Sequence, residues 1–100
     1  MNYKTHNDGI SFQESTFKGY IKSSFHELKT HFGEPTKGDG WKTDALWEIK
    51  FENSVYVEIY NFKNGKNYLK ENGKDLNDIN VWDVASLSNE AINLINNVLK

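Results

Sequence analysis

The sequence has no cysteine, no arginine, a single proline and no long apolar run. The absence of cysteine excludes disulfides, thiolate nucleophiles and cysteine-ligated metal sites. All twelve basic residues are lysines, so an anion would have to be bound by lysine and backbone N–H groups, without the bidentate geometry of arginine. No stretch approaches the roughly 20 apolar residues of a membrane span, and the polar N-terminus lacks a signal-peptide core. We therefore expect a protein that stays in the cytoplasm where it is made.

A chain of 100 residues with a formal net charge of -2 is expected to form one domain with a modest core. Proteins that bind duplex nucleic acid non-specifically carry a basic face or stripe. The charge balance here disfavours that class of partner. We expect a single domain over residues 1–100, in which residues 1–9 are flexible or form a first turn.

The clearest helix signal covers residues 25–32. Ser24 and Glu27 have the spacing of a capping box, in which each side chain accepts a hydrogen bond from the other residue's backbone N–H. Gly33 is suited to the end of the helix, and Pro35 prevents its continuation. These local signals predict a short helix that buries one apolar stripe.

Two stretches of alternating character, 44–51 and 55–62, predict a β-hairpin that turns near Asn53 and Ser54. Two registers are compatible with this pattern. A two-residue turn places Phe51 opposite Tyr56, whereas a loop one residue longer places Phe51 opposite Val57. We favour the second register because a buried apolar face is what sets strand register. That face consists of Trp47, Ile49, Phe51, Val57 and Ile59.

The remaining pattern predicts a strand at 16–22 with Gly19 as a bulge or a point of close approach, a polar surface loop at 69–78 and a strand at 79–85. A C-terminal helix is expected after an N-cap at Ser88. The predicted order is strand, helix, strand, strand, strand, helix. The fold class that buries both helix stripes most simply is α+β, a small antiparallel-rich sheet with both helices packed on one face.

Polar groups gather at the open end of the predicted hairpin, where loop 38–44 enters and segment 61–68 leaves. The glycine-rich start of the loop, with Lys42 and Thr43, is compatible with a backbone nest for a phosphate or carboxylate. The alternative is a tight turn in which aspartate side chains hydrogen-bond to their own loop. The sequence leaves both possibilities open.

Aromatic side chains near this loop are candidates for stacking on a base or anchoring a partner protein. Core packing is the competing explanation for each of them, and solvent exposure decides between the two. The candidate partner-binding or ligand-binding residues are Asp39, Trp41, Lys42, Thr43, Asp44, Tyr60, Asn61, Lys63, Lys66, Asn67, Tyr68 and Trp82.

Enzyme chemistry is not expected. The sequence contains no Gly-x-Ser-x-Gly motif and no ordered serine, histidine and aspartate set. His6, His26 and His31 are too scattered for a metal site, and Glu48 and Glu58 fall on strand positions where solvent exposure is the ordinary explanation. We expect no catalytic residues, no metal and no cofactor.

Several motifs together resemble a family of small proteins encoded by tailed bacteriophages. The family pattern reads FGEP, GDGxKTDAEW, IYN[WF]K and GKNY, preceded by a Ser/Thr-x-x-Gly-Tyr-Ile stretch. Two positions depart from it, since Leu46 replaces a glutamate and Ser54 replaces a usual glycine. The matching segments are FGEP at 32–35, GDGWKTDALW at 38–47, IYNFK at 59–63, GKNY at 65–68 and the stretch at 15–21.

The resemblance implies a phage or prophage origin. Small non-structural phage proteins often act by binding, so the leading hypothesis is an inhibitor of a bacterial defence or host factor, of the anti-CRISPR type or another anti-defence type, in the cytoplasm of the infected host. Loop 38–44 and segment 61–68 would make the contact with a host or defence-system protein. One alternative is an oligomeric sponge that captures a nucleotide signal with Lys42, Lys66 and aromatic rings. The other is a structural phage accessory protein.

Overall fold

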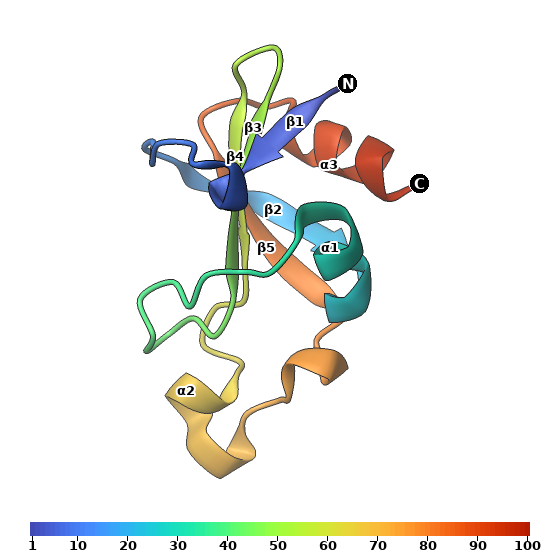
Figure 1. Cartoon of the computed structure of the whole chain (residues 1–100). Coiled ribbons are helices and arrows are strands. Elements are labelled where there is room, and N and C mark those ends of the chain that lie inside the picture. The colour runs from blue at the N-terminus through green and yellow to red at the C-terminus, as the bar shows by residue number, and fades with distance from the viewer.

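A five-stranded sheet runs through the middle of the molecule (Figure 1), and the computed structural model describes all 100 residues. The strand order is β1-β3-β4-β5-β2, and all four strand pairs are antiparallel. The expected α+β class is confirmed. The main elements are β1 (Tyr3–Thr5), β2 (Thr16–Lys22), α1 (Phe25–Phe32), β3 (Leu46–Phe51), β4 (Tyr56–Tyr60), α2 (Lys66–Leu69), β5 (Val81–Ser86) and α3 (Ala91–Leu99).

Helices α1 and α3 pack on the same face of the sheet, touch each other and share one hydrophobic core with the strands. The capping box predicted for α1 is present, since the Glu27 N–H donates to Ser24 Oγ at 3.0 Å and the Ser24 N–H donates to the Glu27 carboxylate at 3.3 Å. Leu28 and Phe32 are the buried side chains of α1. The helix has the predicted bounds because its start and end signals are local.

The register of the β3–β4 hairpin differs from both registers that the sequence suggested. Ile49 lies opposite Val57. The loop contains three residues, because the Ser54 N–H donates to the Phe51 carbonyl at 2.9 Å and Ser54 adopts a left-handed conformation with φ of 72°. The favoured register was wrong by two residues. A two-residue shift keeps every side chain on its face, so the predicted apolar face is the buried one.

The first nine residues contain a strand that the sequence did not predict, followed by a turn. Strand β1 pairs with β3, with Tyr3 opposite Phe51 and Thr5 opposite Ile49. The Tyr3 hydroxyl donates to the His31 carbonyl at 2.7 Å, at the end of α1. Thr5 then caps a 3-10 turn over His6–Asp8. The N-terminal segment therefore forms one edge of the sheet and is attached to α1, and the expectation of a flexible segment is corrected.

The second half of the chain also departs from the predicted pattern. The predicted loop 69–78 holds the end of α2 and two 3-10 turns, Lys70–Asn72 and Leu76–Asp78. Strand β5 starts at Val81 rather than at residue 79. Glu90, not Ser88, occupies the N-cap of α3, although Ser88 Oγ accepts from the Glu90 N–H at 3.1 Å. The element order thus gains β1 and α2, and α2 lies beyond the end of the sheet (Figure 1).

Candidate functional site

One buried asparagine holds the two loops at the open end of the β3–β4 hairpin together. Asn61 is only 1% exposed, and its Oδ1 accepts from the N–H groups of Asp44 and Ala45 at 2.9 Å each. Its Nδ2 donates to Asp44 Oδ1 at 2.9 Å and to Asn64 Oδ1 at 3.1 Å. All the hydrogen-bonding capacity of this amide is used inside the chain, so Asn61 has a structural role.

Further hydrogen bonds extend this contact along both loops. The Asn67 N–H donates to Asp44 Oδ2 and its Nδ2 donates to the Thr43 carbonyl, each at 3.2 Å. The Lys63 N–H donates to the Lys42 carbonyl at 2.7 Å. We call Asp44, Asn61, Asn64 and Asn67 the loop clasp, because they fasten loop 38–44 to segment 61–68.

A second carboxylate organises the glycine-rich loop from within. Asp39 Oδ1 accepts from the N–H groups of Trp41, Lys42 and Thr43 at 2.9, 3.0 and 3.1 Å. These hydrogen bonds, the one from Trp41 first, hold the pKa of Asp39 below its usual value. The N–H groups that a phosphate would need are occupied by the protein's own carboxylate. This geometry is the tight-turn alternative considered from the sequence.

Beside the loop clasp, aromatic rings and lysine ammonium groups share one exposed surface. Trp41 is 58% exposed, and its ring centroid lies 6.0 Å from that of Tyr68. Lys42 Nζ lies 4.6 Å from the centroid of the Trp41 ring. Lys63 Nζ lies 5.5 Å from the Tyr68 centroid and 5.2 Å from that of Phe62, which is 48% exposed. We call these five residues the cation–aromatic surface.

The structure divides the candidate residues into exposed and structural groups. Trp82 is completely buried, with its indole N–H donating to the Ser23 carbonyl at 3.0 Å, so it does not belong to any surface. Thr43 is buried as well. Lys66 pairs with Asp75 at 2.8 Å, and this hydrogen bond raises the pKa of Lys66. Phe62 was missed, although the alternation of the predicted strand 55–62 places it on the face opposite Val57 and Ile59.

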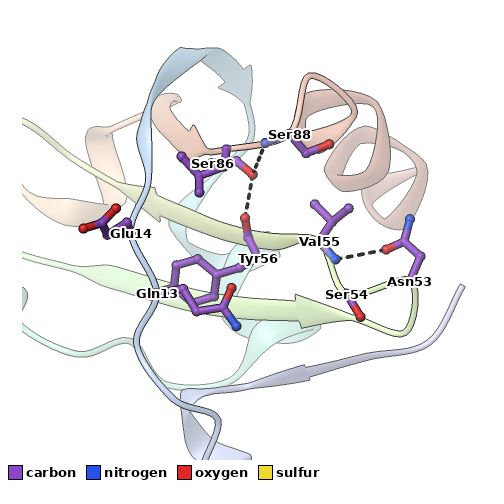
Figure 2. A pocket seen from close by; sticks show the side chains of 9 residues that line it. Gln13, Glu14, Asn53, Ser54, Val55, Tyr56, Ser86 and Ser88 are labelled. Atoms are coloured by element: carbon purple, nitrogen blue, oxygen red, sulfur yellow. Dashed lines mark hydrogen bonds between the residues drawn. The ribbon is translucent and has the colours of Figure 1, made fainter.

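The hollow drawn in Figure 2 lies at the opposite end of the hairpin from the cation–aromatic surface. Its volume is about 260 Å³, and it is lined by the hairpin turn, Gln13, Glu14 and the link from β5 to α3. Ser86 Oγ donates to the Tyr56 carbonyl at 2.6 Å and accepts from the Ser88 N–H at 3.1 Å. These polar groups are satisfied within the chain, so they provide no free recognition group for a ligand.

The structure contains neither a metal-binding cluster nor a helix that could span a membrane. No three histidine or acidic side chains lie close enough together to hold a metal ion. The longest helix, α3, has nine residues, and none of the helices combines the length and apolar character that crossing a bilayer requires.

No protein-family model matches this chain, and no curated protein or solved structure is significantly similar to it. The functional assignment must therefore come from the residues and their geometry. The cation–aromatic surface is the feature that best fits a binding function, because it combines exposed rings with available positive charge.

Proposed function

We propose that this protein is a small, phage-encoded, non-enzymatic binding protein that inhibits a bacterial defence or host factor through the cation–aromatic surface. The phage origin and the defence-related role derive from the motif resemblance. The binding role derives from one observation, which is that exposed Trp41 and Phe62 and partly exposed Tyr68 carry Lys42 and Lys63 beside their rings.

The chemistry of this surface indicates the kind of partner. Tryptophan and tyrosine are frequent binding hot spots because they bury large areas and retain a polar group. The two ammonium groups add positive charge to the rim, so the complementary surface would be apolar at its centre and acidic around it. An acidic surface on a host or defence-system protein fits this chemistry most directly.

The loop clasp supports this proposal because it holds the surface in place before binding. Ordering loops and side chains at an interface costs free energy on binding. Here Asn61, Asp44 and Asp39 fix the backbone under the exposed rings. Part of that ordering cost is therefore met during folding, which favours tight binding by a small protein.

The nucleotide-sponge alternative has less support from the geometry. Lys42 is placed beside an exposed ring, as stacking on a base would need. However, Lys66 is already paired with Asp75, and the loop N–H groups are occupied by Asp39. No particular contact favours a structural accessory role.

The proposal is tested by affinity capture from a bacterial lysate with the full chain, comparing the wild type with Trp41→Ala and Tyr68→Ala. Each substitution should weaken capture of a specific protein about 30-fold, since loss of a hot spot costs about 2 kcal/mol. The matched control is Leu87→Ala, which removes an exposed apolar side chain beside the remote hollow and should have no effect.

Two results would contradict the proposal. One is recovery of the same partner by Trp41→Ala and the wild type at equal yield. The other is a nucleotide released from the purified protein on denaturation and lost in Lys42→Glu, together with an oligomeric mass in size-exclusion chromatography. That second result would favour the sponge.

A further inference from the structure

The sheet face that points away from both helices carries a row of unusual composition. The strand registers place Tyr20 of β2 opposite Asp83 of β5, and Asp83 opposite Tyr60 of β4. These three side chains therefore lie next to each other across three strands, on the face that the core does not use. Tyr20 is 61% exposed. We call them the Tyr–Asp–Tyr row.

Large apolar side chains surround this row and remain exposed. Phe17, opposite Ala85, packs edge-on against Tyr20 with ring centroids 5.2 Å apart. Val81 precedes Asp83 by two residues on β5, so it lies on the same face, and it is also exposed. Contiguous exposed apolar groups on a small soluble domain commonly mark interaction sites.

The chain itself covers only one end of this face. Phe12 packs edge-on against Tyr56 with centroids 6.4 Å apart, and Ser15 Oγ donates to the Glu58 carboxylate at 3.1 Å. Glu58 also accepts from the Tyr56 hydroxyl at 2.8 Å. Residues 10–15 thus cover the end near the hairpin turn and leave the Tyr–Asp–Tyr row uncovered.

The centre of the open face is acidic, and none of its carboxylates forms an ion pair within the chain. Glu48, Glu58 and Asp83 all lie on this face, and neither ion pair of the chain, Lys29 with Glu34 and Lys66 with Asp75, involves any of them. No side-chain or backbone donor in the chain hydrogen-bonds to the Asp83 carboxylate. Burial alone raises the pKa of Asp83 to about 6, so this carboxylate is still mostly ionised at neutral pH.

We propose that the Tyr–Asp–Tyr row docks a partner protein through one lysine or arginine side chain, which enters between the rings of Tyr20 and Tyr60 and pairs with the Asp83 carboxylate. Aromatic faces attract such cations, and the apolar rim of Phe17 and Val81 would accept the methylene groups of the same side chain. A cation is the one ligand that supplies the charge and the donors that Asp83 lacks.

Charge complementarity favours a basic partner over a second copy of this chain. A twofold-symmetric dimer through this face would place the two copies of the same patch against each other, and thus bring the Asp83-centred carboxylates together. The face also continues into the cation–aromatic surface, because Tyr60 contacts Phe62 with ring centroids 6.5 Å apart. This second surface does not depend on the proposed function.

The test is a titration of the isotope-labelled full chain, followed by NMR, with the peptide amide acetyl-Leu-Arg-Leu and with acetyl-Leu-Gln-Leu as its neutral counterpart. The arginine peptide should shift the amide signals of Tyr20, Tyr60 and Asp83. These shifts should approach saturation at a peptide concentration of about 10 mM, as expected for a site with a millimolar Kd. Asp83→Asn, which keeps the shape and removes the charge, should weaken that binding about tenfold, as expected for loss of a charge-assisted pair.

Matched controls separate this face from the other surface. Glu71→Gln removes an exposed carboxylate elsewhere and should leave the shifts unchanged, as should Trp41→Ala. The inference is overturned if both peptides bind equally, if Asp83→Asn binds as the wild type does, or if no signal of this row moves. Shifts of the same row that depend on protein concentration without peptide would also overturn it, because they would assign the face to self-association.

Discussion

The loop clasp and the Tyr–Asp–Tyr row are two polar regions that each contain one aspartate, and the two aspartates differ in their hydrogen bonding. In the clasp, Asp44 receives hydrogen bonds from both Asn61 and Asn67. In the row, Asp83 receives none and sits between two tyrosines. Polar residues in a distinctive motif can thus be fully engaged in holding the chain together. Residues without internal partners are better candidates for recognition.

The glycine-rich loop beside the clasp and the Tyr–Asp–Tyr row shift carboxylate pKa values in opposite directions. Backbone hydrogen bonds lower the pKa of Asp39, so its contribution to stability is present above the ordinary pKa of aspartate and is lost as pH falls through the lowered value. Burial raises the pKa of Asp83 to about 6. Its ionisation therefore opposes folding above about pH 6, and this penalty disappears as pH falls towards 4.

Removing the centre of the clasp is expected to have the largest effect on stability. Asn61→Ala should lower the free energy of unfolding by about 3 kcal/mol, because it leaves the buried N–H groups of Asp44 and Ala45 without an acceptor. Urea denaturation measures this loss. Asn64→Ala removes a single side-chain bond to the same amide and should cost less than about 1 kcal/mol. Equal effects of the two variants would show that Asn61 does not organise the clasp.

A smaller loss is expected at the glycine-rich loop. Asp39→Ala should lower the free energy of unfolding by about 1 kcal/mol, the usual effect of removing a side chain that caps backbone N–H groups. Denaturation at several pH values checks both size and sign, since the difference from the wild type should shrink as the pH falls and Asp39 becomes protonated. Asp39→Asn retains an oxygen acceptor, so its free energy of unfolding should lie between those of the wild type and Asp39→Ala. A deficit that stays constant down to acidic pH would contradict this account of Asp39.

The smallest expected effect is a gain in stability, and it concerns Asp83. Asp83→Asn should raise the free energy of unfolding at pH 7.5 by roughly 0.5 kcal/mol, a value reduced to allow for solvent screening of a half-buried group. The charged neighbours on this face are Glu58 of β4 and Lys22 of β2. Thermal denaturation at pH 7.5 and near pH 4 should show the gain only at the higher pH. A loss of stability at pH 7.5 would mean that Asp83 has an internal partner.

The local signals for α1 and for the bulge in β2 were reliable, because they act without the rest of the chain. The bounds of α1 follow from Ser24, Glu27 and Gly33, which all lie within a few residues of the helix. Gly19 was predicted as a bulge, and the register of β2 against β5 does shift between Phe17 and Gly19. Capping and bulge geometry depend on nearby backbone atoms, so short-range patterns are sufficient to predict them.

Predictions that depended on distant partners were less successful. Strand β1 has three residues, and it exists because β3 offers it an edge. The hairpin register depended on Ser54 adopting a left-handed conformation, which is uncommon for a residue other than glycine. One local prediction also failed: Ser88 is not the N-cap of α3, because the chain forms an additional turn before the helix starts at Ala91.

The sequence by itself determined the α+β class, the apolar faces of its strands and helices, and the crowding of polar groups at one end of a hairpin. Only the tertiary structure decided that Trp82 is buried and Trp41 exposed, that Asn61 serves the fold, and that Asp83 lacks a partner. The physical reason is that periodicity records which side of an element faces the core. Whether a polar group is satisfied depends on atoms that the folded chain brings together from distant positions.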